Sequence, residues 1–418
     1  MKFEDYNLAQ EIKQSIDLLG YKKPTDIQYR SIPAILKGED VLAIAQTGTG
    51  KTAAFAIPIL NIIHNSKRSK RDDGVKCLIM APTHELALQI ALVFRNLGKH
   101  TKVETFCIHG GVEQDPQIKR LNKGVDIVVA TPGRLFDLVA QKHLDLHKVE
   151  ILVLDEADHM LDLGFIKDIR DLMRFLPKSR QTLFFSATIN EEIKKLAYSL
   201  VTNAIRIQIS PKNPVAKNIT HSVAFIEMDD KRFFLESLIK NNQESKILIF
   251  VRTKVRAERV KSAMTRLHLI TDTIHSDKLQ EERGRTMAAF RKGELKILIA
   301  TDISARGIDV PNVDFVINYD LPDSCEQYVH RVGRTGRGSE KGKAISFCSK
   351  EELTYLEEIE TNLDKPIARH EISKEDYQYT IAVTDDRPVE DDWQSLLKEA
   401  AKQEIIIDAL RKKRRKKK

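Results

Sequence analysis

Two short apolar runs in the first half of the chain end in residues that could do phosphate chemistry. The run "VLAIA" is followed by "QTGTGKT", and the run "ILVL" is followed by "DEADHM". A glycine-rich loop between a strand and a helix suits a triphosphate, because backbone N–H groups and Lys51 face phosphate oxygens. The Thr52 hydroxyl suits Mg²⁺, and Asp155 stands where a carboxylate reaches the same metal. Together the two segments predict a site for a nucleoside triphosphate with Mg²⁺.

The neighbours of these residues extend the predicted site. Glu156 follows Asp155 directly and is expected to orient and deprotonate the water that attacks the γ-phosphate. Ala45 departs from the usual pattern, because it occupies the position of the first glycine. The loop residues expected around the phosphates are Thr47, Gly48, Thr49 and Gly50. Two other interpretations of the acidic segment remain open: a transition-metal site formed by Asp155, Glu156, Asp158 and His159, and a helix N-cap.

Apolar, β-branched runs alternate with helical patterns along most of the chain, which predicts βαβ units around a parallel sheet. The runs are DVLAIA, CLIMA, DIVVA, ILVL and TLFF in the first half, and ILIF, ILIA, DFVIN and AISFC in the second. We therefore predict an α/β fold of two tandem domains, each a mostly parallel sheet flanked by helices. Such sheets bind ligands beyond the carboxyl ends of their strands, where this chain places its glycines, hydroxyls and charges.

The length of 418 residues suffices for two domains and an extension. We expect an N-terminal domain over 1–208, a linker over 209–219, a C-terminal domain over 220–367 and an extension over 368–418. The linker contains two prolines and no apolar periodicity, which is typical of a mobile connection. The sequence has no apolar run near 20 residues, no signal pattern at its start and no CxxC spacing among four cysteines. We therefore expect a cytoplasmic protein with reduced thiols.

The ordered motifs resemble those of the DEAD-box RNA helicase family over about Phe3 to Ile367. Bacterial members with short basic C-terminal tails are the most similar. The resemblance implies two RecA-like domains, ATP and Mg²⁺ as cofactors, and RNA-stimulated ATP hydrolysis that locally unwinds short RNA duplexes with little sequence preference. The segment "GYKKPTDIQ" matches the family's Q motif. This match implies that Gln28 reads the adenine edge while Phe3 or Tyr21 flanks the base.

The resemblance also assigns residues that couple the two domains. Ser186 to Thr188, "SAT", is similar to the motif that hydrogen-bonds the DEAD segment, with Asp158 as its partner. The segment "HRVGRTGR" implies arginine fingers on the γ-phosphate, because a guanidinium spreads positive charge over phosphate oxygens. The fingers are Arg334 and Arg337, and the resemblance further implies that Arg331 pairs with acidic groups of the first domain, that His330 links to first-domain motifs and that Asp309 contacts the ribose.

Other strand ends are rich in hydroxyls, small residues and isolated arginines, which suits a sugar-phosphate backbone. The RNA contacts implied by the resemblance are Thr83, Gly110, Gly111, Thr131, Gly133 and Arg134 in the first domain, and Arg252, Gln280, Arg283, Thr301 and Gly307 in the second. Two positions depart from the family pattern, because His84 replaces an arginine and Ser276 replaces a glycine. A neutral imidazole grips a phosphate or carboxylate less firmly than guanidinium, which bears on RNA affinity or domain packing near His84.

The net charge of +8 equals the charge of the terminal run "RKKRRKKK", and without these eight residues 60 basic residues face 60 acidic ones. Contact with a polyanion must therefore come from local placement. The tail Arg411–Lys418 could add RNA affinity, recruit ribosomes or RNA-processing complexes, act as a nuclear address, or serve as a solubilising segment. Two alternative functions also remain: a DNA-tracking helicase, and an ATP-gated RNA clamp whose hydrolysis only resets its grip.

Overall fold

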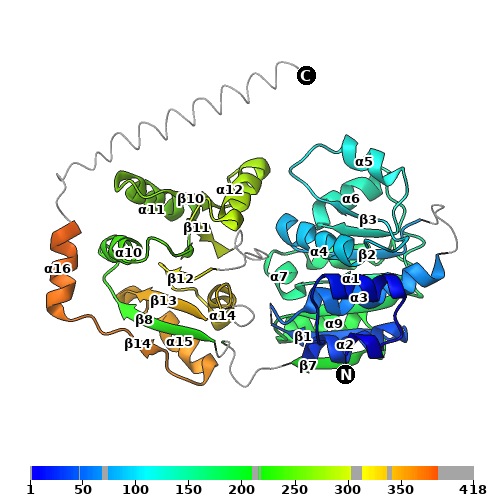
Figure 1. The fold of residues 1–418 in the computed structure, drawn as a ribbon, viewed down its shortest axis with the longest axis horizontal. Helices are drawn as coiled ribbons and strands as arrows, with labels where there is room; N and C mark the ends of the chain where they lie inside the picture. Colours follow the sequence, from blue (N-terminus) through cyan, green and yellow to red (C-terminus); the bar gives the residue numbers. More distant parts are fainter. Residues whose placement is uncertain are drawn as a thin grey trace, which may run out of the picture.

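Two seven-stranded parallel sheets, each flanked by helices, lie side by side in the structure (Figure 1). It is a computed structural model that describes residues 2–384, except 47, 68–73, 210–214, 216–217, 303–312 and 337–340. The predicted α/β fold with two tandem sheets is confirmed. Residues Thr47, Arg337, Asp309 and Gly307, most of the predicted linker and the basic tail lie outside the described residues.

The first sheet has the strand order β3-β4-β2-β5-β6-β1-β7, and every pair is parallel. Its strands are β1 (Val41–Ala45), β2 (Cys77–Met80), β3 (Thr105–Ile108), β4 (Ile127–Ala130), β5 (Ile151–Leu154), β6 (Gln181–Ser186) and β7 (Ile205–Ile209). Its helices are α1 (Gln10–Leu18), α2 (Asp26–Leu36), α3 (Lys51–Ser66), α4 (His84–Leu97), α5 (Asp115–Leu121), α6 (Pro132–Ala140), α7 (Ala157–Asp162), α8 (Ile166–Leu172) and α9 (Glu191–Leu200), after a 3₁₀ turn at Phe3–Asp5. The phosphate loop follows β1, and the acidic segment follows β5.

The second sheet has the order β10-β11-β9-β12-β13-β8-β14, again parallel throughout. Its strands are β8 (Ile219–Phe225), β9 (Ile247–Val251), β10 (Thr271–Ile274), β11 (Ile297–Thr301), β12 (Phe315–Asn318), β13 (Gly342–Cys348) and β14 (Ala368–Arg369). Its helices are α10 (Lys231–Lys240), α11 (Lys254–Arg266), α12 (Gln280–Lys292), α14 (Cys325–Val332), α15 (Leu353–Leu363) and α16 (Lys374–Thr384), with a 3₁₀ turn at Lys350–Glu352. In Figure 1, α12 and α14 lie on the side that faces the first sheet.

The structure joins part of the predicted extension to the second sheet. Strand β14 pairs with β8, and the α16 side chain of Tyr377 packs its ring 4.8 Å from that of Phe234 on α10. The Tyr377 hydroxyl also donates a hydrogen bond of 2.8 Å to Asp230. Residues 368–384 therefore pack with the second domain, beyond the boundary predicted at 367.

Each sheet is buried on both faces, as expected for parallel strands between helices. Along β1, Val41 and Ala43 belong to one apolar cluster, whereas Leu42 and Ile44 belong to the other. Successive side chains of a strand point to opposite faces, so one continuous apolar run serves both clusters. The sheet is thereby held rigid, and its strand ends become fixed positions for polar side chains.

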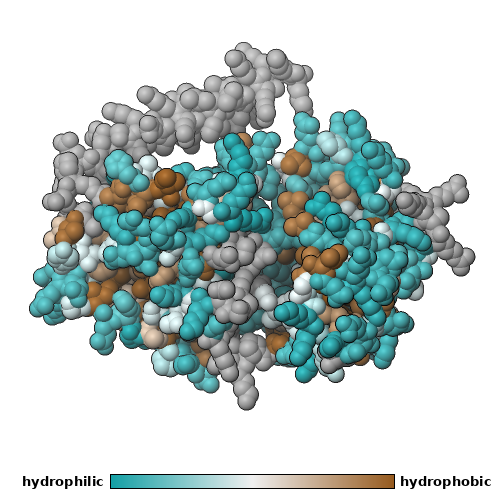
Figure 2. Space-filling view, viewed as in Figure 1, coloured by the Kyte–Doolittle hydropathy of each residue, from teal (hydrophilic) through white to brown (hydrophobic). Residues whose placement is uncertain are grey.

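The face in Figure 2 is mostly hydrophilic, with smaller hydrophobic groups on both domains. Among the described residues, no helix is long and apolar enough to cross a membrane. All four cysteines are free, and burial raises the pKa of each thiol, for Cys325 to about 11.

Candidate active site and domain interface

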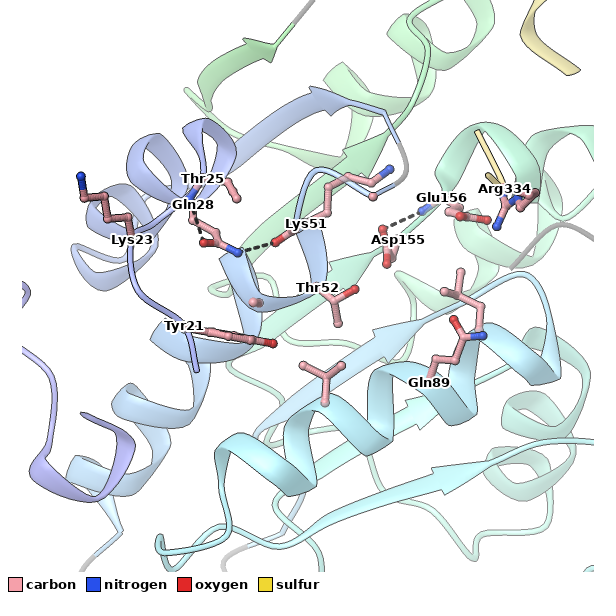
Figure 3. A pocket seen from close by; sticks show the side chains of 15 residues that line it. Tyr21, Lys23, Thr25, Gln28, Lys51, Thr52, Gln89, Asp155, Glu156 and Arg334 are labelled. Carbon is pink, nitrogen blue, oxygen red and sulfur yellow. Dashed lines mark hydrogen bonds between the residues drawn. The ribbon is translucent and has the colours of Figure 1, made fainter. Parts of the chain in front are cut away.

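One cavity of about 460 Å³ lies against the carboxyl ends of the first sheet's strands (Figure 3). The predicted site residues that line it are Tyr21, Gln28, Gly48, Gly50, Lys51, Thr52, Asp155, Glu156 and Arg334. Arg334 follows α14 of the second domain, and the others belong to the first. The cavity therefore brings together residues from both domains. The lining residues to which the sequence assigned no role are Lys23, Thr25, Ala53, Leu86, Gln89 and Val93, of which Lys23 and Thr25 lie within the segment "GYKKPTDIQ".

The phosphate loop is held by Gln28 at the start of α2. The Gln28 Oε1 atom accepts a bond of 3.0 Å from the Thr25 N–H, and its Nε2 donates one of 3.1 Å to the Gly50 carbonyl. Gly50 has a φ of +93°, and a Cβ there would lie 2.5 Å from Gln28 Nε2. Glycine is favoured here because L side chains rarely adopt this backbone conformation, and a Cβ would also displace the Gln28 amide. The Gln28 amide can make further hydrogen bonds beyond these two, which would allow it to bind the adenine edge. That contact stays a prediction.

Lys51 opens α3 with its charged group turned into the cavity. The side chain is buried, and its Nζ has no hydrogen-bond partner among the described residues. A buried ammonium without a partner is costly, so the site suits an anionic ligand. The Thr52 and Asp155 side chains line the same cavity, and their oxygens are the kind of ligand that Mg²⁺ prefers.

The pKa values of the two adjacent carboxylates are shifted in opposite directions. Burial raises the pKa of Asp155 to about 6, although the Lys51 charge opposes the shift. Burial also acts to raise the pKa of Glu156, but the neighbouring His159 and the charges of Lys51 and Arg334 outweigh it and lower that pKa to about 2. Glu156 therefore stays ionised at neutral pH. Its φ of +50° is uncommon outside glycine, and such strain is typical of functional sites.

The structure does not bring the acidic segment together as a cluster of metal ligands. Among the residues that the structure describes, no group of three or more histidine, cysteine or acidic side chains could hold a metal. His159 is buried, and its Nδ1 lies 3.5 Å from Glu156 Oε2, but neither ring nitrogen makes a regular hydrogen bond to a described residue.

Asp158 connects the acidic segment to the strand end of β6. Its Oδ2 accepts bonds of 3.0 Å from the Ala187 N–H, 3.1 Å from the Thr188 N–H and 3.3 Å from the Thr188 hydroxyl. The predicted contact with the Ser186–Thr188 segment is therefore present, whereas the buried Ser186 hydroxyl has no hydrogen-bond partner in the described part of the chain. The role of this contact in domain coupling stays a prediction.

Two other predicted residues are not among those that line the cavity. Phe3 is buried and packs its ring 6.3 Å from that of Tyr21, so Tyr21 alone of this pair lines the cavity. The Thr49 hydroxyl donates to the Gln46 carbonyl at 2.7 Å and so shapes the loop. The link of His330 to first-domain motifs stays a prediction.

The expected pairing of Arg331 with the first domain is wrong. Arg331 is buried in the second domain, where Nε and NH2 donate to the two Asp302 oxygens at 2.5 and 2.6 Å. Its NH1 donates to the Asp320 carbonyl at 2.7 Å. Asp302 follows the end of β11 and lies within reach of α14, so the nearest carboxylate belongs to the same domain.

Four residues form two contacts between the domains, and two of the four are predicted RNA contacts. Nδ1 of His84 lies 3.2 Å from Gln280 Oε1, and Arg283 NH2 lies 2.7 Å from Glu85 Oε1. The first turns of α4 and α12 therefore contact each other across the interface. The sequence assigned Gln280 and Arg283 to RNA, and the structure places them against the first domain.

Neighbouring residues fit this interface. Gly111 has a φ of +74°, and a Cβ there would lie 3.1 Å from Gln280 Cβ. The ring centroids of His84 and His109 are 5.2 Å apart. His84 thus takes part directly in the packing of the two domains, whereas its effect on RNA affinity stays a prediction. At the other departure, Ser276 is exposed with a φ outside the left-handed region, so serine fits there.

The remaining predicted RNA residues stand at strand ends of both domains. Thr83 caps α4, because its hydroxyl accepts a bond of 3.3 Å from the Leu86 N–H. Arg134 is buried and donates to the Val112 carbonyl at 2.8 Å, and its NH1 finds no hydrogen-bond partner within the described ranges. Arg252 donates to the Leu321 carbonyl at 3.0 Å and lies 4.8 Å from the Tyr355 ring centroid. The others are Gly110 after β3, Thr131 and Gly133 at the start of α6, and Thr301 at the end of β11.

Comparisons with known proteins identify the family. Residues 25–196 match the DEAD/DEAH box helicase family, and residues 230–339 match the helicase conserved C-terminal domain. The chain is 41% identical over 374 residues to the ATP-dependent RNA helicase RhlB of Shewanella frigidimarina, covering 88% of this chain and 85% of that protein. The chain belongs to the DEAD-box family of ATP-dependent RNA helicases. The DEAD-box ATP-dependent RNA helicase RhpA of Helicobacter pylori is 37% identical, with 88% and 74% covered. This protein is therefore an ATP hydrolase that acts on RNA.

The arrangement of the helicase domains is similar to that of a ligand-bound relative. A variant of S. cerevisiae Dbp5 bound to RNA and ADP-BeF3 has a TM-score of 0.81, with 32% identity over 92% of this chain and 98% of that one. The same variant bound to Nup159, a Gle1 variant, IP6 and ADP scores 0.61, with 91% and 100% covered. Both Dbp5 chains are the same variant and are 32% identical to this chain. The difference between the two scores therefore reflects how the domains are arranged in each complex. The present arrangement is the more similar to the complex with RNA and ADP-BeF3.

Proposed function

We propose that ATP with Mg²⁺ binds in the cavity shared by the two domains, and that RNA-stimulated hydrolysis there drives local unwinding of short RNA duplexes. The observation that supports this proposal is the position of Arg334, which lines the same cavity as Lys51, Asp155 and Glu156. An arginine from the second domain completes the site only when the domains are together. Ligands that bring the domains together therefore also assemble the catalytic residues.

Each residue has a chemical task in this proposal. Lys51 neutralises phosphate oxygens, and Thr52 and Asp155 hold Mg²⁺. The metal, when bound, supplies positive charge at the β- and γ-phosphates. Ionised Glu156 orients the attacking water by accepting its hydrogen bond and takes up its proton. Arg334 spreads its charge over the γ-phosphate oxygens as the bond to the leaving group lengthens.

The RNA is proposed to lie across the strand ends of both sheets, where Thr83, Thr131, Arg134 and Arg252 are placed. The contacts of His84 with Gln280 and of Glu85 with Arg283 close the two domains beside that path. RNA bound across both domains would favour the same closed arrangement as ATP. This shared preference explains how RNA stimulates turnover, because each ligand lowers the cost of closure for the other.

Two substitutions test the roles. Lys51→Ala should abolish ATP turnover, whereas Glu156→Gln should keep ATP bound and hold RNA tightly, and Lys99→Ala at an exposed position is the matched control for Lys51. Turnover is measured with and without RNA, and strand separation is measured on RNA and DNA duplexes with ATP or a non-hydrolysable analogue. Normal turnover in either variant would contradict the assigned roles. Efficient unwinding of the RNA duplex with the analogue alone would show that hydrolysis does not drive strand separation.

The setting of this activity is also a proposal. The curated relatives are bacterial RNA helicases, which supports work on RNA in the cytoplasm. Binding to ribosomes or RNA-processing complexes through Arg411–Lys418 stays a prediction, because the tail lies outside the described residues.

A further inference from the structure

Gln89 is a polar residue of the nucleotide cavity to which the proposal above gives no task. It lies on α4 between Leu86 and Val93, and all three line the cavity. Residues three and four positions apart share one face of a helix, so α4 contributes an apolar wall with a single amide in it. The Gln89 Nε2 atom is buried and has no hydrogen-bond partner among the described residues. Figure 3 shows the side chain extending from α4 into the cavity.

A buried N–H without a partner costs free energy that a suitable ligand would recover. Lys51 Nζ, in the same cavity, is also buried without a hydrogen-bond partner among the described residues. The cavity therefore contains two donors that a ligand with acceptor atoms could satisfy. The neighbours of Gln89 on its own helix face are Leu86 and Val93, whose side chains cannot accept a hydrogen bond. No acceptor for this N–H is found among the described residues, and a bound ligand with exposed oxygens would supply one.

The position of Gln89 indicates which part of the ligand it meets. Figure 3 draws Tyr21 and Gln28, the predicted adenine contacts, on one side of the view, and Gln89 on the other side, below Glu156 and Arg334. Glu156 and Arg334 are the residues proposed to act at the γ-phosphate. Of ATP and ADP, only ATP brings phosphate oxygens to that end of the cavity.

We propose that the Gln89 amide donates a hydrogen bond to the γ-phosphate of ATP and thereby distinguishes ATP from ADP. This inference rests on the proposed binding of ATP in the cavity. A neutral amide suits the task, because it binds a phosphate oxygen without adding charge beside Lys51 and Arg334.

The same helix links this contact to the domain interface. His84 and Glu85, at the start of α4, contact Gln280 and Arg283 of the second domain. Gln89 lies little more than one helical turn further on, since a turn takes about 3.6 residues. A γ-phosphate held by Gln89 therefore fixes the helix that also makes the interdomain contacts. Loss of the Gln89 amide should weaken the preference for ATP and the ATP-dependent gain in RNA affinity together.

The test compares two nucleotides in one protein. Gln89→Leu keeps a similar volume and removes the amide, and we expect it to weaken a non-hydrolysable ATP analogue about tenfold while ADP affinity changes less than about twofold. Gln89→Glu, which places negative charge near the γ-phosphate, should reduce analogue affinity at least as much. The matched control is Asn96→Leu, which removes an exposed amide from the same helix and should leave both affinities unchanged. Affinities are measured by titration calorimetry on the full chain.

The ratio of the two affinities separates the possible outcomes. A selective loss of analogue affinity in both Gln89 variants supports the inference. An equal loss of affinity for both nucleotides indicates a packing role and overturns the inference. Unchanged affinities for both nucleotides also overturn it. Wild-type protein that bound neither nucleotide would instead overturn the proposed ATP site, and this inference with it.

Discussion

The ion pair between Glu85 and Arg283 provides a quantitative test of domain closure. The pair joins α4 of the first domain to α12 of the second, with 2.7 Å between Arg283 NH2 and Glu85 Oε1. The two side chains are only 15% and 10% exposed. A pair with so little solvent access is screened less than a surface pair. Its removal should therefore reduce the stability of the closed arrangement measurably.

The expected size follows from opposing terms. At 2.7 Å and an effective dielectric constant of about 20, Coulomb attraction is about 6 kcal/mol. Both groups lose water on closure, and this desolvation offsets several kcal/mol of the attraction. Close charge pairs across interfaces typically retain at least ~1.5 kcal/mol of coupling. We therefore expect about 2 kcal/mol for this pair, which corresponds to roughly 30-fold in an equilibrium constant.

A double-mutant cycle measures this coupling. Arg283 is also a predicted RNA contact, so its single substitution mixes two effects, and the cycle of Glu85→Gln with Arg283→Gln isolates the pair. RNA affinity is measured by fluorescence anisotropy in the presence of a non-hydrolysable ATP analogue. The matched control is the pair of Lys254 with Asp277, which also lies at 2.7 Å but is 52% and 55% exposed within the second domain. That cycle should give less than about 1 kcal/mol.

The result that would refute the reasoning is additivity. If the effects of Glu85→Gln and Arg283→Gln on RNA affinity add within about 0.5 kcal/mol, the pair does not stabilise the closed, RNA-bound arrangement. A coupling that is equally large without nucleotide would also contradict it, because closure is expected to require the ATP analogue.

Three further predictions concern other contacts. Burial lowers the pKa of His84 from 6.5, with smaller contributions from His109 and Arg283, although Gln280 and Glu85 act in the opposite direction. The closed arrangement therefore favours the neutral imidazole. RNA affinity in the presence of the ATP analogue should fall as the pH drops below 6.5, and it should fall less in His84→Asn. Asp158→Ala leaves the Ala187 and Thr188 donors without their acceptor and should cost about 3 kcal/mol of stability in denaturant titration, whereas Asp137→Ala at an exposed position should cost little. Deletion of Arg411–Lys418 should weaken RNA binding and leave turnover at saturating RNA unchanged. The slope of log affinity against log salt concentration should become shallower by up to about 0.7 for each phosphate contact that is lost. An unchanged slope would show that the tail does not contact RNA.

Most of the sheet was predictable because its central strands are apolar on both faces. The runs at β1, β2, β4, β5 and β6, and at β9, β11, β12 and β13, were all identified from sequence. The strands that were missed are the four edge strands β3, β7, β10 and β14, together with β8 beside an edge. The edge strand β7, "IRIQI", is largely exposed, and the edge strand β10, "TDTI", is polar although it is mostly buried, so the apolar signal is weak in both.

The nucleotide site was predictable for a related reason. Lys51 and Thr52 are consecutive, and Asp155 and Glu156 are consecutive, so short segments carry their chemistry together with the strand that positions it. Backbone geometry over a few residues then determines where the side chains point. The sequence alone therefore determined the parallel α/β fold, the phosphate loop and the acidic segment.

Only the tertiary structure decided which side chains meet across longer distances. Arg331 pairs with Asp302 of its own domain, Arg283 pairs with Glu85 of the other, and Gln89 faces the nucleotide cavity. An arginine or an amide has no intrinsic preference for one such partner, because charge and hydrogen-bonding capacity are the same in every location. The partner is set by the packing of helices on the two sheets, which depends on contacts spread over the whole chain.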